Sequence, residues 1–254
     1  MTRRALCVGI NRYPNAPLSG CVNDANDWSQ ALTARGYLTT RMLDGAATKA
    51  NITGALRDLV AMSRFGDRLV FTYSGHGTWL PDRDGDEPDR RDEALCAIDY
   101  EDGGLIVDDE LAAIFAQRRY GVRVTIVSDS CHSGTVARFV EQSGVRFVNP
   151  LSFLTGEDYE AALTAMDGTR SVTAPRAATG TILMAGCDDL EYSYDAFIDG
   201  RWNGAFSRAA LDTLPPGATS YHAWIASILA TIDRKRYPQT PQLFASRWQR
   251  YLPF

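Results

Sequence analysis

The stretch Val122-Arg-Val-Thr-Ile-Val-Ser-Asp-Ser-Cys-His-Ser-Gly134 predicts a buried strand that ends at a reactive side chain. Mostly β-branched residues run from Val122 to Val127, which is typical of a strand covered on both faces of a parallel sheet. Small and polar residues follow at once, so we expect Cys131 just past the carboxyl end of the strand. Ligands bind and chemistry occurs at that edge of open α/β sheets.

A second apolar run predicts that a histidine reaches the same edge. Residues Arg68 to Tyr73 form a strand pattern, and Ser74-Gly75-His76-Gly77-Thr78 follows it directly. The carboxyl ends of parallel strands share one edge, so His76 and Cys131 are expected to enter one crevice. A thiol and an imidazole are the minimum parts of a cysteine nucleophile and its general base.

The other apolar segments alternate between strand and helix patterns. Strands are expected at 5–10, 38–43, 94–99, 181–185 and, at an edge, 241–246, and helices at 23–35, 49–63, 108–117, 159–166, 204–214 and 221–232. Asn23 and Asp24 are candidate helix caps. The alternation predicts an α/β fold with a mostly parallel central sheet of about six strands, flanked by helices.

Bulk properties narrow the class of protein. Residues 1–254 are expected to form a single domain, with 135–180 inserted as a regulatory or processing loop region, because that long stretch has weak periodicity. A net charge of -5 argues against nucleic acid as the main partner. No uncharged apolar stretch of about 18 residues predicts a membrane span. The apolar run at Ala5–Ile10 is too short for a signal peptide.

The five cysteines favour an intracellular setting. They are scattered, odd in number and without CxxC spacing. Free thiols in a reducing, cytoplasmic environment are the simplest interpretation, and a zinc site is not indicated.

Two motifs together resemble one family of enzymes. Residues Tyr73 to Thr78 and the segment Asp129-Ser130-Cys131-His132-Ser133-Gly134 are similar to the histidine and cysteine motifs of caspases and metacaspases. The histidine lies about 50 residues before the cysteine in caspases, as it does here. The caspase signature Gln-Ala-Cys-x-Gly is absent, so the resemblance is to metacaspases. It extends to 20–25, 203–206 and 241–243, and so covers most of the chain.

This resemblance implies a caspase-like fold and a cysteine endopeptidase mechanism. Cys131 would attack a peptide carbonyl, and His76 would accept the thiol proton and later protonate the leaving amine. The backbone N–H groups of Gly77 and Cys131 would stabilise the oxyanion. His132 is a rival base, although an immediate neighbour of the nucleophile generally points away from it. His222 lies in an apolar helical pattern and is expected to be structural.

The resemblance also implies a pocket for the residue before the cleaved bond, P1. Asp24, Ser74 and Asp129 match the positions that form an acidic well for Arg or Lys in metacaspases. Carboxylates suit the planar fork of a guanidinium group. The alternative is that Asp24 caps a helix and Asp129 braces the strand end.

The acidic residues of the segment 82–93 suggest a calcium-binding loop. Asp82, Asp84, Asp86 and Glu93 fit positions 1, 3, 5 and 12 of an EF-hand loop, but Glu87 stands where glycine is required. An EF-hand is therefore not indicated.

A different calcium site follows from the resemblance. Asp92, Asp108 and Asp109 match metacaspase calcium ligands, while Arg138 replaces the fourth ligand and would repel the ion. Calcium binding and a solvated acidic loop stay open as alternatives.

The arginines of the 135–180 region suggest regulation. Arg170 and Arg176 lie among small residues and are our expected sites of self-processing, or of cleavage by an activating protease. The implied substrates are proteins or peptides with Arg or Lys at P1. Two alternatives stay open: a catalytically silent caspase-like module that binds partners, and a thiol amidase or transpeptidase that uses the same dyad.

Overall fold

A six-stranded sheet forms the centre of the computed structural model, which describes residues 1–83, 90–131, 144–166, 180–188, 191–214 and 219–254. Its strand order is β11-β8-β7-β3-β1-β2. The strands are β1 (Arg3–Gly9), β2 (Leu38–Leu43), β3 (Arg68–Ser74), β7 (Arg123–Asp129), β8 (Thr181–Ala185) and β11 (Gln242–Phe244). All pairs are parallel except β11 with β8. The predicted mostly parallel sheet of about six strands is confirmed.

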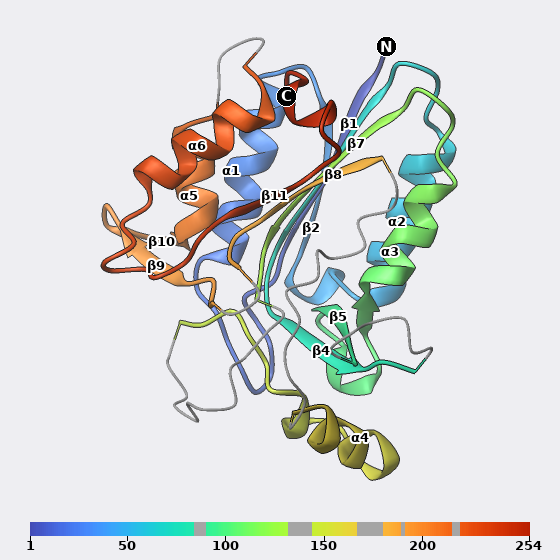
Figure 1. The fold of residues 1–254 in the computed structure, drawn as a ribbon, viewed down its shortest axis with the longest axis vertical. Helices are drawn as coiled ribbons and strands as arrows, with labels where there is room; N and C mark the ends of the chain where they lie inside the picture. Colours follow the sequence, from blue (N-terminus) through green and yellow to red (C-terminus); the bar gives the residue numbers. More distant parts are fainter. Residues whose placement is uncertain (84–89, 132–143, 167–179, 189–190, 215–218) are drawn as a thin grey trace.

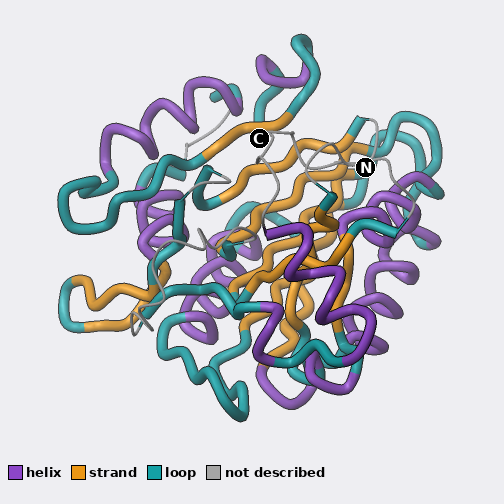
Figure 2. Tube along the Cα trace, turned by 60° about the horizontal axis from the view of Figure 1, so that its bottom comes forward, coloured by secondary structure: helices purple, strands orange, loops and turns teal. Residues whose placement is uncertain are grey.

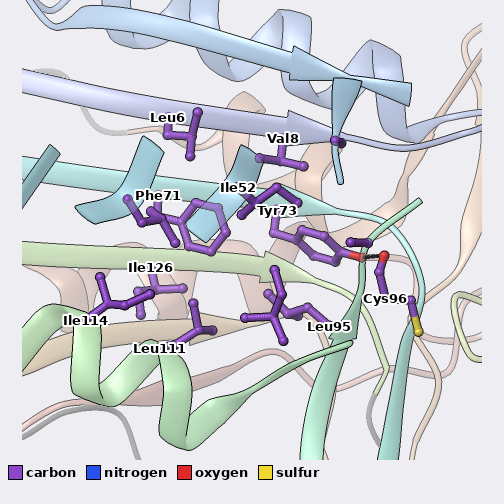
Figure 3. Packing of buried hydrophobic residues seen from close by; sticks show 14 of the residues in the cluster. Leu6, Val8, Ile52, Phe71, Tyr73, Leu95, Cys96, Leu111, Ile114 and Ile126 are labelled. Atoms are coloured by element: carbon purple, nitrogen blue, oxygen red, sulfur yellow. Dashed lines mark hydrogen bonds between the residues drawn. The ribbon is translucent and has the colours of Figure 1, made fainter. Parts of the chain in front are cut away.

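Helices cover both faces of this sheet (Figure 1). On one face lie α1 (Cys21–Thr33), α5 (Ala205–Asp212) and α6 (Tyr221–Thr231), and on the other lie α2 (Lys49–Ala61) and α3 (Asp108–Ala116). Residues alternate between the two cores along each strand: Leu6 and Val8 pack on the α2 and α3 side, and Ala5 and Cys7 on the α1 side. Figure 3 shows the first of these cores. A strand buried on both faces explains the continuous apolar runs of the sequence.

The same alternation positions two polar residues at the carboxyl ends of β3 and β7. Ser74 is paired with Asp129 across these strands. Val70 and Val127 pack in the core beneath α1, α5 and α6. Because side chains two or four positions apart share a face, Ser74 and Asp129 also point toward those helices. Both are buried.

Smaller elements gather at this carboxyl edge, which Figure 2 turns toward the viewer. An antiparallel sheet contains β4 (Gly77–Pro81), β5 (Arg91–Cys96) and β6 (Leu105–Val107). A second pair contains β9 (Asp195–Ile198) and β10 (Arg201–Gly204), and α4 (Gly156–Met166) lies beside β4. The strand expected at 94–99 is therefore shifted: it begins at Arg91, ends at Cys96 and belongs to the small sheet.

The first helix begins earlier than predicted, which changes the role of Asp24. Helix α1 starts at Cys21, and the N–H of Asp24 donates to the carbonyl of Gly20 at 2.9 Å. Asp24 therefore lies inside the first turn, on the buried stripe that includes Ala25 and Trp28. The prediction that Asn23 or Asp24 caps this helix is wrong. Among the described helices, none has the length and apolarity needed to cross a membrane.

Candidate active site

The imidazole of His76 is fixed by a backbone carbonyl. Its Nε2 lies 2.6 Å from the carbonyl oxygen of Ala16. A carbonyl can only accept, so Nε2 carries the proton in the neutral ring and Nδ1 keeps its lone pair. Nδ1 is buried and makes no hydrogen bond within the described part of the chain, including to Cys131. Nδ1 is therefore the nitrogen left available for proton transfer.

Two tyrosine hydroxyls hold the backbone around this histidine. The N–H of His76 donates to the Tyr13 hydroxyl at 3.1 Å, and the Tyr73 hydroxyl donates to the His76 carbonyl at 2.7 Å. Both hydroxyls also lie within 2.8 Å of the Cys96 carbonyl (Figure 3 labels Tyr73 and Cys96). This buried network ties the histidine loop to β5.

Burial keeps His76 neutral at physiological pH. Loss of hydration is the main reason why the pKa of His76 is lowered from 6.5 to about 4; the Arg146 guanidinium acts in the same direction, and the hydrogen bond to Ala16 opposes both. An imidazole without a proton on Nδ1 can act as a base, whereas an imidazolium cannot.

Cys131 follows β7 and is also buried. Its Sγ accepts the N–H of Ser193 at 2.5 Å and lies 3.5 Å from the Ser193 carbonyl. A hydrogen bond to Cys131, together with burial, raises the pKa of Cys187 well above its usual value. Cys187 is therefore a protonated thiol beside the candidate nucleophile.

The two motifs meet at the backbone carbonyl of Arg146. The N–H groups of Gly77 and Cys131 both donate to this oxygen, at 3.0 and 3.1 Å. Two converging backbone donors are the geometry that stabilises an oxyanion when a carbonyl is attacked.

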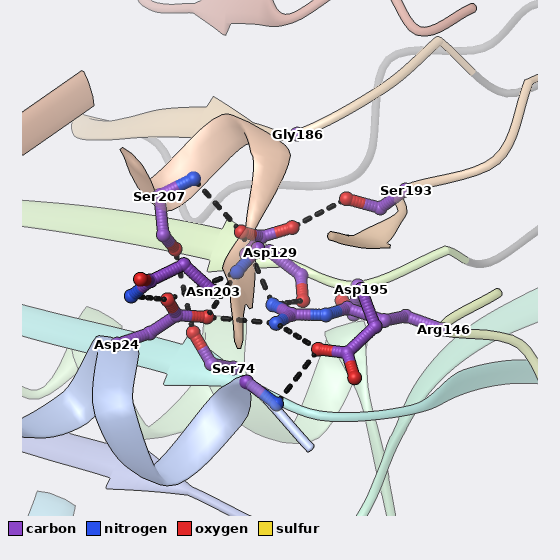
Figure 4. Close-up of polar contacts among 12 residues, drawn as sticks. Asp24, Ser74, Asp129, Arg146, Gly186, Ser193, Asp195, Asn203 and Ser207 are labelled. Atoms are coloured by element: carbon purple, nitrogen blue, oxygen red, sulfur yellow. Dashed lines mark hydrogen bonds and ion pairs between the residues drawn. The ribbon is translucent and has the colours of Figure 1, made fainter. Parts of the chain in front are cut away.

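The side chain of Arg146 fills an acidic pocket (Figure 4). Its guanidinium group is completely buried, with Nη2 2.7 Å from Asp24 and 3.0 Å from Asp195. Nη1 lies 3.1 Å from the Asp129 carboxylate and 3.2 Å from its backbone carbonyl. Three carboxylates thus surround one cation.

Each carboxylate of this pocket has donors other than Arg146. Asp24 accepts from the Asn203 side chain and the Gly204 N–H, both at 3.0 Å. Asp129 accepts from the Ser193 hydroxyl and the Ser207 N–H. Asp195 accepts from the N–H groups of residues 19 and 20, at 2.7 and 2.9 Å. Each carboxylate therefore has at least two hydrogen-bond donors besides the guanidinium.

The start of α5 forms one wall. Gly204 precedes the helix, and a Cβ added there would come within 3.0 Å of Asp129 and of the Arg146 guanidinium. Glycine is needed at this position because the backbone itself lines the pocket. Burial and the nearby Asp129 raise the pKa of Asp24 to about 6, although Arg146 opposes the shift.

Comparison with known proteins identifies the family. Residues 3–139 match the metacaspase, peptidase C14 domain family. The chain belongs to the metacaspase family. It is 34% identical to Metacaspase-1B of Aspergillus fumigatus, over 96% of this chain and 69% of that protein. Metacaspase-1 of Mycosarcoma maydis is 31% identical over 96% of this chain and 70% of its own length.

A solved structure extends this similarity to the fold. The crystal structure of protein GSU0716 from Geobacter sulfurreducens aligns with a TM-score of 0.74 at 30% identity, covering 100% of this chain and 97% of that one. This metacaspase is therefore a cysteine peptidase with a caspase-like fold.

The acidic cluster around Arg146 contains residues that the sequence did not single out. Asp195 lies in a segment with several acidic residues and no regular spacing, and Ser193 lies two residues before it without any motif around it. Both reach the site through contacts between distant segments, so no local pattern identifies them. The predicted Ser74 lies at the pocket, where its hydroxyl is 3.5 Å from that of Ser207 (Figure 4).

The predicted calcium ligands lie apart from this pocket. Asp92 is on β5, and Asp108 and Asp109 begin α3. Pairing of Ala94 with Val107 brings these two segments together. Within the described ranges, however, no group of three or more His, Cys, Asp or Glu side chains is arranged to hold a metal ion. Calcium binding stays a prediction.

Several predicted positions fall outside the described residues. These are Asp84, Asp86 and Glu87 of the acidic segment, His132 and Arg138 after the cysteine, and the processing candidates Arg170 and Arg176. The exposed His222 lies on α6 with its ring tilted against that of Tyr251, 5.6 Å between ring centroids, and its structural role stays a prediction.

Proposed function

We propose that this metacaspase is an endopeptidase that cleaves protein or peptide substrates after Arg or Lys, with Cys131 as nucleophile and His76 as general acid and base. One observation carries the proposal: Arg146 has its guanidinium group among three carboxylates while its carbonyl accepts from Gly77 and Cys131. A substrate with arginine at P1 would make the same contacts.

The chemistry follows from the available donors and acceptors. His76 Nδ1 accepts the proton of the Cys131 thiol as sulfur attacks the P1 carbonyl carbon. The N–H groups of Gly77 and Cys131 stabilise the oxygen as it becomes negative. His76 then protonates the leaving amine, and water hydrolyses the thioester.

Charge and shape set the specificity. Two guanidinium nitrogens meet Asp24, Asp129 and Asp195, so arginine is held by a planar fork, whereas lysine would offer one point charge. A P1 aspartate would add a fourth carboxylate to the pocket. We expect the preference order arginine, lysine and then, far behind, neutral or acidic residues.

A covalent probe tests this proposal directly. A peptide electrophile with P1 arginine should label the active protein on Cys131 alone, and a matched probe with P1 aspartate should leave it unlabelled. Peptide mapping by mass spectrometry would locate the label among the five cysteines. Fluorogenic arginyl, lysyl and aspartyl peptides, with an intact protein substrate, would measure turnover.

Each rival hypothesis gives a different result. A silent binding module would neither react with the arginyl probe nor release fluorophore. An amidase or transpeptidase of non-protein substrates would react but leave the protein substrate intact. Preference for aspartate at P1 would reject the assignment of the acidic pocket.

His76 should make folding stability depend on pH. Its pKa is lowered from 6.5 to about 4, so the unfolded chain binds a proton between these values that the folded chain does not. The stabilisation is therefore complete above pH 6.5 and is lost as the pH falls toward 4. Between pH 7 and pH 4, the free energy of unfolding should fall by about 3 kcal/mol more for the parent than for His76→Gln.

Urea denaturation of the two proteins in a Cys131→Ala background would measure that difference without self-cleavage. His222→Gln serves as the matched control, because this histidine is exposed on α6. It should follow the parent at every pH. Parallel pH curves for the parent and His76→Gln would contradict the low pKa of His76.

A further inference from the structure

We infer that Tyr13 is a positioning residue for the general base: its hydroxyl holds the backbone N–H of His76, and the loop that carries it holds the imidazole in the orientation that proton transfer needs. The inference rests on the proposed function and adds a residue on which that function depends. The loop concerned, residues 10–20 between β1 and α1, is called the tyrosine loop below.

The imidazole of His76 is not oriented by the nucleophile. Its Nδ1, the nitrogen that would take the thiol proton, makes no hydrogen bond to Cys131. The direction of Nδ1 therefore depends on what holds the rest of His76, namely its backbone and its Nε2. A catalytic base acts only when its lone pair is within reach of the proton that it accepts.

The tyrosine loop contacts His76 at both of these places. The Tyr13 hydroxyl accepts the His76 N–H at 3.1 Å, and the carbonyl oxygen of Ala16 lies 2.6 Å from Nε2. The rings of Tyr13 and His76 also lie against each other, 4.7 Å between their centroids. One loop thus fixes the backbone and the ring of the base together.

Hydrogen bonds close and anchor the tyrosine loop. The Leu18 N–H donates to the Asn11 carbonyl at 2.9 Å, which closes the chain around Tyr13 and Ala16. The Asn11 N–H donates to the carboxylate of Asp44 at 2.7 Å. Because the loop is closed in this way, a shift of the tyrosine moves the Ala16 carbonyl with it.

The two hydroxyls at this histidine are not equivalent. Without the Tyr73 hydroxyl, the His76 carbonyl would keep the Cys96 N–H at 3.0 Å. The Cys96 carbonyl would keep the Tyr13 hydroxyl at 2.8 Å. Without the Tyr13 hydroxyl, however, the buried His76 N–H would lose its acceptor. A buried donor without a partner is costly, so Tyr13 is the more important of the two.

Gly75 leaves the space in which the two hydroxyls meet. The hydroxyl oxygens of Tyr13 and Tyr73 are 3.1 Å apart, and a Cβ added at Gly75 would come within 2.6 Å of each. A side chain at this position would displace them. Tyr13 and the histidine motif, although distant in sequence, therefore form one packed unit.

Steady-state hydrolysis of an arginyl peptide tests the role of Tyr13. Tyr13→Phe should lower kcat by about 10- to 100-fold and leave KM within about threefold, because a misplaced catalytic group slows the reaction without weakening binding. Tyr73→Phe should lower kcat by less than about fivefold, since its backbone partners keep other hydrogen bonds. Tyr221→Phe is the matched control and should behave as wild type does. Its hydroxyl is also buried and hydrogen-bonded, to Thr125 at 2.6 Å, but it lies in the core on the other face of the sheet.

Nitrogen NMR spectra of the imidazole show whether the loss comes from the position of His76. The chain has three histidines, and His76→Gln identifies the signals of this one. In a Cys131→Ala background, His76 should carry its proton on Nε2 and titrate at about 4. Tyr13→Phe should raise this pKa toward 6.5, because water reaches the loosened ring, and Tyr221→Phe should leave it unchanged.

The other charges near His76 are the same in these proteins. Arg146 lowers the pKa of His76 and Asp195 raises it. Burial raises the pKa of both Tyr13 and Tyr73 well above its usual value, so their hydroxyls are neutral. A change of the His76 pKa in Tyr13→Phe therefore reports a lost contact and not a lost charge.

Three results would overturn the inference. These are a wild-type kcat in Tyr13→Phe, an equal loss of kcat in Tyr13→Phe and Tyr73→Phe, and an unchanged His76 pKa in Tyr13→Phe. If Tyr13→Phe fails to fold, hydrogen exchange of the His76 amide in the Cys131→Ala protein decides. Exchange as slow as that of the β3 amides supports the inference, and exchange as fast as that of an exposed loop overturns it.

The outcomes separate the inference from the proposed function. A wild type that hydrolyses arginyl peptides, with Tyr13→Phe equally active, overturns the inference and leaves the function standing. If no variant hydrolyses an arginyl peptide, the proposed function fails, and the inference fails with it.

Discussion

Cys131→Ala is expected to lower kcat/KM for an arginyl peptide by about 10⁴-fold or more, since removing a covalent nucleophile leaves only binding and oxyanion stabilisation. The fold should persist. Cys131 is small and buried, and the N–H that helps to hold the substrate carbonyl belongs to the backbone and survives the change. Initial rates with a fluorogenic peptide and the thermal unfolding midpoint would be measured together.

Cys187→Ala is the matched control for this experiment. Both cysteines are buried, and Cys187 makes a hydrogen bond to Cys131. Cys187 has a pKa raised well above its usual value, so it stays protonated and unreactive. Its removal should change kcat/KM by no more than about threefold. A large loss in Cys187→Ala with activity retained in Cys131→Ala would transfer the nucleophile to Cys187.

The strands that position the candidate site could be predicted because each forms a continuous apolar run in the local sequence. The runs that end before Ser74 and Asp129 have the composition of strands buried on both faces, and polar residues mark where each strand stops. The two small antiparallel pairings, β4 with β5 and β9 with β10, escaped prediction. Their strands are short, and tertiary contacts decide how such strands pair.

The residues of the acidic pocket could be predicted only in part, because tertiary contacts bring some of them to the site. Asp129 was identified by its place in a motif, but Asp195 reaches the site because the N–H groups of residues 19 and 20 fix its carboxylate. Arg146 was visible as one of several arginines in a segment of weak periodicity. Its position among the carboxylates depends on contacts across more than 100 residues of sequence.

Asp24 lies among the carboxylates around Arg146 and does not cap α1, and these two alternatives have opposite consequences. A cap lies at the surface, accepts a backbone N–H of its own helix and contributes about 1 kcal/mol of stability. Asp24 is instead completely buried on α1 and accepts from the N–H of Gly204, which is distant in sequence. Its charge can therefore serve recognition, and a substitution tests that directly.

Asp24→Asn should lower kcat/KM for an arginyl peptide by roughly 10²- to 10⁴-fold at pH 8, because losing one partner of a buried ion pair costs about 3 to 5 kcal/mol. Hydrolysis of the matching citrulline peptide, which has the shape of arginine without its charge, should change far less. The ratio of the two rates isolates charge recognition from any general damage to the fold. As the pH falls through about 6, the pKa of Asp24, wild type should lose part of the same preference.

Asp27→Asn is the control, because Asp27 lies one helical turn along the same helix and also pairs with an arginine. Its partner is Arg201, 2.8 Å away, and both side chains are partly exposed. Solvent weakens such a pair to about 1 kcal/mol or less, so the ratio of arginyl to citrulline hydrolysis should stay at the wild-type value. An equal fall of the ratio in both variants would mean that the net negative charge of this end of α1 attracts arginine. A fall in Asp24→Asn alone would mean that arginine is recognised by a carboxylate removed from water and aimed at its guanidinium group.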